Sequence, residues 1–166
     1  MKQIFLVGPM GSGKTTVGQL LAKSLKLNFY DTDAEITAIA GQSISAIFSS
    51  KGEDYFRQLE SNIIDNVGSG VIATGGGLPV FNNNMQRLKK KGLVLYLQVS
   101  CQHAMSRIVN DGNRPLLKGN ETEQQALWSE LLAQREAIYL EAHQTVNGNQ
   151  LANVVVDNVI DLLKKN

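Results

Sequence analysis

The sequence predicts an α/β fold in which a parallel sheet of about five strands is covered by helices on both faces. Short apolar runs of strand length alternate along the chain with longer stretches whose apolar residues recur at helical spacing. A glycine-rich segment directly follows the first apolar run and leads into the first helical stretch, which is where parallel sheets bind ligands. The 166 residues suffice for one domain with a single core.

The expected strands are short and mostly apolar. Residues 4–7 show no polar alternation and end at Gly8 and Pro9, which is typical of a strand buried on both faces. The other expected strands cover residues 27–31, 71–74, 93–99 and 145–146. Because the carboxyl ends of parallel strands meet at one edge of a sheet, we expect ligand-binding residues directly after these runs.

Helical periodicity of apolar residues predicts helices between and after these strands. The first helix is expected to begin at Lys14, and Ser43 is expected to cap a short helix over residues 44–48. The remaining helical stretches cover residues 56–67, 85–91, 105–109, 128–139 and 155–163. Residues 110–120 contain glycine, proline and polar side chains, and we expect them to form a mobile lid.

Composition and charge argue against several classes of function. The net charge of +1 gives no basic surface for nucleic acid, so we expect no nucleic-acid partner. No apolar run reaches the roughly 18 residues that a membrane-spanning helix needs, so we expect no membrane partner. The single cysteine, Cys101, cannot form an internal disulfide, and we expect a reducing, cytoplasmic location.

Residues 8–15 read Gly-Pro-Met-Gly-Ser-Gly-Lys-Thr, which is the full P-loop pattern between a strand and a helix. Its glycines let main-chain N–H groups converge on a phosphate, and the helix N-terminus adds its positive dipole end. We expect Lys14 to reach the β- and γ-phosphates and the Thr15 hydroxyl to bind Mg²⁺. The alternative is a glycine-rich turn with one exposed lysine. The expected nucleotide-binding residues of this segment are Gly11, Ser12, Gly13, Lys14, Thr15 and Thr16.

Three other segments could bind a polar molecule that accepts the phosphoryl group. Residues 31–33, Asp-Thr-Asp, follow the second strand, where carboxylates can accept hydrogen bonds from hydroxyl groups or stand behind a Mg²⁺-bound water; the alternative is a turn and helix N-cap. Arg57 and Glu60 lie one helical turn apart, with a surface salt bridge as the alternative. The three glycines at 75–77 would let a ligand approach the main chain closely, or form a simple flexible loop.

Together these segments resemble the shikimate kinase family, and their order and spacing agree across nearly the whole chain. The motifs that carry the resemblance are the P-loop, Asp-Thr-Asp at 31–33, Phe-Arg-x-x-Glu at 56–60, Thr-Gly-Gly-Gly at 74–77, Arg-Pro-Leu-Leu at 114–117, and Arg135 four residues before Tyr139. The resemblance implies a three-layer P-loop kinase fold, with residues 1–166 as one domain. Within it, a helical segment at about 32–60 would bind the acceptor and residues 110–120 would be the lid.

The resemblance also implies an activity, which is transfer of the γ-phosphoryl group of ATP to the 3-hydroxyl of shikimate. Asp33 would hold the ring hydroxyls and help to deprotonate the attacking one. Arg57 and Arg135 would bind the carboxylate through their planar guanidinium groups, and Gly76 would offer its main-chain N–H. The implied substrate-binding residues are Asp33, Arg57, Gly75, Gly76, Gly77 and Arg135.

On the nucleotide side, the resemblance implies that Arg114 swings in on the lid and stabilises charge on the transferring phosphate. Mg²⁺ would be bound by Thr15 directly and by Asp31 through water. Arg107 would lie against adenine, or be an ordinary solvated helix residue, and Gln150 resembles the residue that other members use beside adenine. The implied catalytic residues are Lys14, Asp33 and Arg114.

The implied partners are shikimate and ATP or ADP, and the implied oligomeric state is a monomer. Two rival functions stay open at this point. The first is another small P-loop kinase, for gluconate or a nucleoside monophosphate, although such a kinase should lack the joint set of Asp33, Arg57, Gly76 and Arg135. The second is a nucleotide-binding regulatory module without catalysis, against which the intact set of Lys14, Thr15, Asp33 and Arg114 argues.

Overall fold

The structure is a computed structural model, and it describes residues 3–110 and 120–165. At its centre is a five-stranded sheet in which every neighbouring pair of strands is parallel, as predicted. The strands are β1 (Gln3–Val7), β2 (Phe29–Asp31), β3 (Val71–Ala73), β4 (Gly92–Gln98) and β5 (Gln144–Asn147), arranged in the order β2-β3-β1-β4-β5. Strand β2 begins at Phe29 and is therefore shorter than the predicted 27–31.

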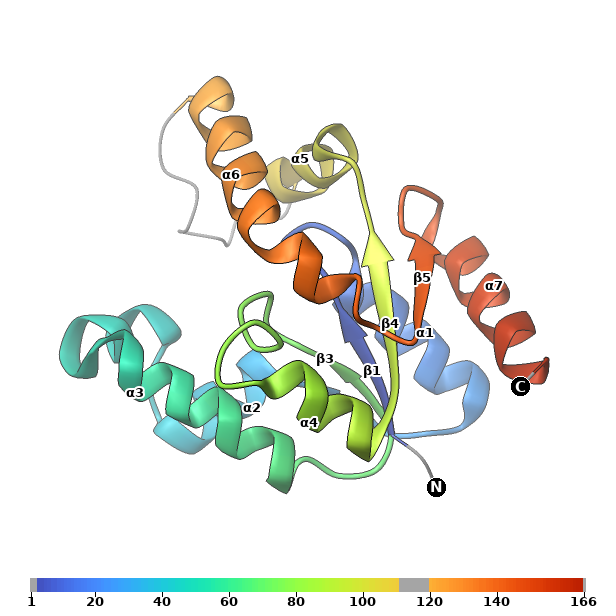
Figure 1. The fold of residues 1–166 in the computed structure, drawn as a ribbon, viewed down its shortest axis with the longest axis horizontal. Coiled ribbons are helices and arrows are strands. Elements are labelled where there is room, and N and C mark those ends of the chain that lie inside the picture. The colour runs from blue at the N-terminus through green and yellow to red at the C-terminus, as the bar shows by residue number, and fades with distance from the viewer. Residues whose placement is uncertain (1–2, 111–119, 166) are drawn as a thin grey trace.

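Helices cover both faces of this sheet (Figure 1). Helices α1 (Lys14–Leu25) and α7 (Ala152–Lys164) pack on one face, and α3 (Ile44–Asn66) and α4 (Asn84–Lys91) pack on the other. The remaining helices are α2 (Thr32–Ala40), α5 (Cys101–Asn110) and α6 (Glu121–Tyr139). The predicted three-layer fold is confirmed.

The side chains of β1 explain why two separate cores form. Ile4 and Leu6 pack with α1 and α7, whereas Phe5 and Val7 pack with α3 and α4. Successive side chains of a strand point to opposite faces, so a strand covered on both sides has to be apolar throughout. All four are at most 6% exposed, and burying one such side chain stabilises a fold by about 1.5–3 kcal/mol.

Helix α3 joins the two helices that the sequence predicts over 44–48 and 56–67. It is interrupted at Gly52, whose φ of 82° lies in the left-handed region, so its two halves run in different directions. Ser43 caps the first half as predicted, since its hydroxyl accepts the main-chain N–H of Ala46 at 3.2 Å.

Helix α5 lies beyond the carboxyl end of β4, and α6 runs from beside α5 down along β4, where Tyr139 packs on Tyr96 (Figure 1). A small apolar cluster, which includes Met105 and Trp128, packs the two helices together. Asn120 begins α6 with a capping box, exchanging hydrogen bonds with Glu123 at 2.9 and 3.0 Å. The predicted lid, residues 110–120, falls largely on 111–119, which are outside the described residues. Within the described ranges, no helix has both the length and the apolar composition that a membrane crossing requires.

Candidate active site

A cleft of about 2110 Å³ opens at the carboxyl edge of the sheet. Its walls come from the P-loop, α2, α3, the glycines after β3, α5, α6 and the start of α7. Every predicted site residue that the structure describes lines this cleft. Arg114, for which the sequence predicts a catalytic role, lies outside the described residues. The cleft therefore brings together segments from most of the length of the chain.

The P-loop is the turn between β1 and α1. Gly11 has a φ of 76°, and a Cβ atom built on it would lie 2.7 Å from the carbonyl oxygen of Ala104, so the position requires glycine. The Lys14 ammonium folds back over the turn and donates to the carbonyl oxygens of Gly8 and Pro9, each at 2.8 Å. Its charge is therefore held at the mouth of a loop whose N–H groups suit an anion.

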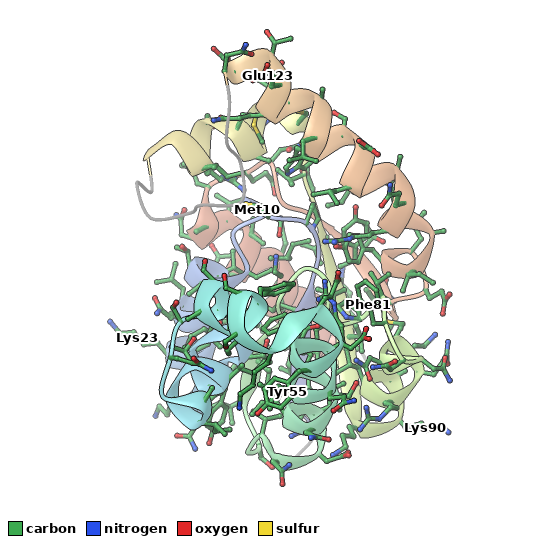
Figure 2. The ribbon with its side chains drawn as sticks, turned by 90° about the vertical axis from the view of Figure 1, so that its left-hand side faces the viewer. Met10, Lys23, Tyr55, Phe81, Lys90 and Glu123 are labelled. Carbon is green, nitrogen blue, oxygen red and sulfur yellow. The ribbon has the colours of Figure 1, made fainter. Side chains whose placement is uncertain are left out.

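A tryptophan of α6 supports the P-loop from outside the nucleotide pocket. Trp128 is 3% exposed, and its indole N–H donates to the carbonyl oxygen of Met10 at 2.9 Å. Figure 2 shows Met10 on its loop below α6, whose first turn carries the labelled Glu123. Trp128 thus combines packing between α5 and α6 with a hydrogen bond that the sequence pattern does not signal.

Asp31 has two tasks at the end of β2. Its Oδ1 atom caps α2 by accepting the main-chain N–H groups of Asp33 and Ala34 at 3.1 and 3.4 Å. Its Oδ2 atom accepts the hydroxyl of Thr15 at 2.8 Å. The N-cap alternative is correct for Asp31, and yet the same carboxylate faces the P-loop.

The two oxygen atoms of Thr15 and Asp31 fit a Mg²⁺ ion. Mg²⁺ prefers hard oxygen ligands, and in kinases it is bound by one or two protein oxygens together with phosphates and water. Among the described residues, no cluster of three or more histidine, cysteine or acidic side chains could hold a metal by itself. A Mg²⁺ ion bound here would therefore take most of its ligands from a nucleotide and from water.

The three glycines at 75–77, which we call the glycine turn, lie between the P-loop and α3. The main-chain N–H of Gly75 donates to the hydroxyl of Thr32 at 2.9 Å, and the carbonyl of Gly76 accepts the hydroxyl of Tyr139 at 2.7 Å. A Cβ atom built on Gly75 would lie 2.5 Å from Oδ1 of Asp33. The turn therefore packs directly against polar side chains, and the alternative of a simple flexible loop does not fit these contacts.

Arg57 is held in a fixed position on α3. Its guanidinium pairs with Glu60 at 2.7 Å and with Glu53 at 2.8 Å, and lies 4.0 Å from the ring centroid of Phe81. Phe81 is labelled in Figure 2, on the segment that follows the glycine turn. A Cβ atom on Gly77 would clash with the guanidinium. These contacts leave the guanidinium beside the main chain of the turn.

Glu60 is only 1% exposed, so its pairing with Arg57 is not the surface salt bridge that the sequence left open. Burial raises the pKa of the Glu60 carboxyl, while the hydrogen bond and the positive charge of Arg57 lower it. The negative charge of Asp33 raises this pKa further, and Arg135 opposes that effect. The electrostatic coupling means that Asp33, Arg57, Glu60 and Arg135 occupy one neighbourhood.

Arg135 reaches the glycine turn from α6. A Cβ atom built on Gly76 would lie 3.8 Å from Nη1 of Arg135 and 3.7 Å from the hydroxyl of Tyr139. Burial raises the pKa of Tyr139, and the charge and hydrogen bond of Arg135 lower it. Two guanidinium groups therefore flank the glycine turn, Arg57 near Gly77 and Arg135 near Gly76.

At the other end of the cleft, Arg107 braces two loops. It donates to the carbonyl oxygens of Gly11 at 3.2 Å, Gly148 at 2.7 Å and Gln150 at 3.2 Å. It is therefore not an ordinary solvated helix residue. Gln150 meets Arg107 through its main chain, and its side chain accepts a hydrogen bond from Asn158 at 2.8 Å. Both predicted base-contacting residues lie at this end of the cleft.

Sequence reasoning missed several residues that shape the site. Thr32 and Tyr139 lie within or beside motifs that were recognised, so spacing alone could have drawn attention to them. Phe81 had no sequence signal, because an aromatic residue eight positions after β3 is not part of any pattern. Its role depends on α3 bringing Arg57 to that place.

Comparisons with known proteins agree on the family and the fold of this chain. The sequence model of the family described as shikimate kinase matches residues 10–164. A shikimate kinase of Methylococcus capsulatus is 43% identical over 169 aligned positions, which cover 99% of this chain and 93% of the relative. The solved structure of a shikimate kinase from Acinetobacter baumannii in complex with shikimate has a TM-score of 0.89 at 38% identity, covering 99% of this chain and 94% of that one. A shikimate kinase structure from Bacteroides thetaiotaomicron has a TM-score of 0.93 at 31% identity and covers 98% of each chain. This chain therefore belongs to the shikimate kinase family.

Proposed function

We propose that this chain transfers the γ-phosphoryl group of ATP to the 3-hydroxyl of shikimate, giving shikimate 3-phosphate and ADP in the biosynthesis of chorismate and the aromatic amino acids. The observation that carries the proposal is one cleft with a P-loop lysine at one side and two arginines around a glycine turn at the other. The relative from Acinetobacter baumannii, whose structure contains shikimate, supports this acceptor.

The acceptor side of the cleft suits a small hydroxylated acid. Arg57 and Arg135 supply two guanidinium groups for the carboxylate, and the glycine turn between them adds main-chain N–H donors. Asp33, next to Gly75, accepts hydrogen bonds from ring hydroxyls and takes the proton of the attacking one as the bond to phosphorus forms. The acid is thus held at one end while its hydroxyl faces the P-loop.

The nucleotide side supplies positive charge to the phosphates. Lys14 and the N–H groups of the P-loop hold the β- and γ-phosphates, and Arg107 and Gln150 lie at the end of the cleft that suits adenine. Mg²⁺, held by Thr15 and through water by Asp31, would neutralise phosphate charge when it is bound. Positioning and charge neutralisation are the main catalytic needs of phosphoryl transfer.

Further proposals concern Arg114, the domain organisation, the location and the oligomeric state of the protein. Arg114 would stabilise charge on the transferring phosphate, a role that rests on the resemblance of residues 114–117 to the family motif. We propose further that residues 1–166 act as one domain and as a cytoplasmic monomer, with the acceptor segment at about 32–60 formed by α2 and the first part of α3.

The proposal is tested by measuring ADP release with ATP and Mg²⁺ and one candidate acceptor at a time. The acceptors are shikimate, gluconate, a nucleoside monophosphate and none. We expect turnover with shikimate alone, and phosphorus-coupled NMR of the product should place the new ester on the 3-oxygen. Turnover with gluconate or the monophosphate instead would assign the protein to another small P-loop kinase activity. ATP binding without turnover of any acceptor would favour a regulatory module.

A further inference from the structure

We propose that Tyr139 is a positioning residue, whose hydroxyl holds the Gly76 carbonyl and thereby aims the N–H of Gly77 at the carboxylate of the bound acid. The inference rests on the proposed function and deepens it. It assigns to Tyr139 an effect on the affinity for the acid, although Tyr139 acts through the glycine turn and not by direct contact with the substrate. The Tyr139 hydroxyl donates to the carbonyl oxygen of Gly76 at 2.7 Å.

The side chain of Tyr139 is held rigidly by its surroundings. It is the last residue of α6, its side chain is 0% exposed, and its ring packs against that of Tyr96 with centroids 5.3 Å apart. Arg135 lies four residues earlier, so the two side chains project from the same face of α6. One helix therefore delivers a guanidinium for the acid and at the same time fixes the turn that the acid meets.

The planarity of the peptide bond means that a contact on the Gly76 carbonyl also fixes the direction of the Gly77 N–H. The Gly76 carbonyl and the Gly77 N–H belong to one planar group, and in a trans peptide they point in opposite directions. The described chain contains no cis peptide bond. A carbonyl held toward Tyr139 therefore directs the Gly77 N–H away from Tyr139. Gly77 itself lies against the Arg57 guanidinium, so a carboxylate bound by Arg57 would lie close to this residue.

The turn leaves these amide groups available to a ligand. Gly75 donates its N–H to Thr32, and the carbonyls of Gly75 and Gly77 accept main-chain N–H groups from Leu78 and Val80. Within the described part of the chain, no atom accepts a hydrogen bond from the N–H of Gly76 or Gly77. Consecutive N–H donors beside two guanidinium groups form a concave site for an anion.

Glycine explains why an outside restraint is needed. Glycine has no side chain that could anchor it, and it has more main-chain conformations available than any other residue. At Gly76 the Tyr139 hydroxyl is the side-chain contact that selects one of them. Burial raises the pKa of Tyr139, so its phenol stays protonated and remains a hydrogen-bond donor around neutral pH.

The test compares Tyr139→Phe with Tyr96→Phe. Both tyrosines are 0% exposed and their rings pack together, but the Tyr96 hydroxyl donates its hydrogen bond to Glu136, at 3.4 Å, rather than to the glycine turn. We expect Tyr139→Phe to raise KM for shikimate about 3- to 10-fold, which is the effect of one lost hydrogen bond. KM for ATP should change less than about twofold in either variant, and Tyr96→Phe should leave KM for shikimate unchanged.

Two outcomes would overturn the positioning role. The first is an equal change of KM for shikimate in both variants, which would indicate general loosening of the shared core. The second is a rise of KM for ATP in Tyr139→Phe as large as the rise for shikimate. Failure of the wild-type protein to phosphorylate shikimate would instead overturn the proposed function, so the two failures are distinguishable.

A second measurement does not depend on a variant. In ¹⁵N-labelled wild-type protein, titration with shikimate should shift the amide resonance of Gly77, and in Tyr139→Phe the same shift should be smaller at saturation. A Gly77 resonance that does not respond to shikimate in the wild-type protein would show that its N–H does not meet the acid, and would overturn the inference.

Discussion

The two sides of the cleft are built in different ways. The nucleotide side centres on one continuous segment, residues 8–16, in which Lys14 contacts carbonyl groups five and six positions before it. The acceptor side is assembled from α2, α3, the glycine turn and α6, and its hydrogen bonds join residues 43 and 63 positions apart. A short motif can specify the first side, whereas the second exists only when four elements dock correctly.

Helix α6 connects the two sides. Trp128, near its middle, donates to Met10 of the P-loop, and Tyr139, at its end, donates to Gly76 of the glycine turn. Each contact uses a buried aromatic side chain with one polar atom, which combines apolar packing with a directed hydrogen bond. The P-loop therefore has a mainly local design that is supported by two distant side chains, Trp128 on Met10 and Arg107 on Gly11, while the acceptor pocket consists almost wholly of distant contacts.

The largest effect is expected at Lys14. Lys14→Ala should lower kcat by about 10³-fold or more, because it removes a fixed charge from the phosphates as negative charge shifts in the transition state. Circular dichroism should stay unchanged, since the lysine contributes little to the apolar core. Lys23→Ala, at an exposed position on the same helix, is the matched control. Near-normal turnover of Lys14→Ala would remove the P-loop from the mechanism.

A smaller and more selective effect is expected at the acceptor arginines. Arg57→Lys and Arg135→Lys should each raise KM for shikimate about 10-fold or more, because lysine keeps the charge and loses the planar two-pronged donor. KM for ATP should change much less. Arg87→Lys is the control, since Arg87 also forms an ion pair but does not line the cleft. A larger change for ATP than for shikimate would assign the two arginines to the nucleotide side.

A variant of Trp128, which supports the P-loop, should change KM for ATP rather than KM for shikimate, the reverse of what is expected for Tyr139→Phe. Trp128→Phe keeps an aromatic ring and removes the N–H that donates to Met10, so KM for ATP should rise about threefold while KM for shikimate stays nearly constant. Urea unfolding should be measured in parallel, because the smaller ring leaves space in the core. If both KM values rise together, α6 acts as a single rigid support and the separation between the two sides is wrong.

The smallest effect concerns the pH dependence of stability. Burial raises the pKa of Glu60 above its unfolded value of 4.5, so the native state binds this proton more tightly than the unfolded state does. The stability contributed by protonated Glu60 is present below pH 4.5 and is lost as pH rises through the raised native pKa. In Glu60→Gln this loss is absent, so the free energy of unfolding should fall less steeply with pH over that window.

The measurement is urea unfolding over a pH series beginning at 4.5, with Glu53→Gln as the matched variant. Glu53 pairs with the same arginine but its side chain is 55% exposed. If the free energy of unfolding changed with pH at the same slope in Glu60→Gln and in the wild-type protein, the raised pKa of the buried Glu60 carboxyl would be contradicted.

Much of the fold was predictable from local pattern. The five parallel strands, the helix beginning at Lys14 and the cap at Ser43 follow from periodicity and from residue types at helix ends. The break at Gly52 was anticipated only as a gap between two helices. The site could be predicted in part, since recognition of the motifs identified which residues matter but not which atoms they contact.

The sequence by itself determined the α/β class and the P-loop, because neighbours in the chain are neighbours in space within a strand, a turn or one helical turn. Only the tertiary structure decided that Glu60 is buried, that Arg57 packs on Phe81, and that the carbonyl of Gly76 is held from α6. Those contacts depend on how helices cross the edge of the sheet. That placement is set by the packing of whole apolar faces, to which any single residue contributes only a small part of the free energy.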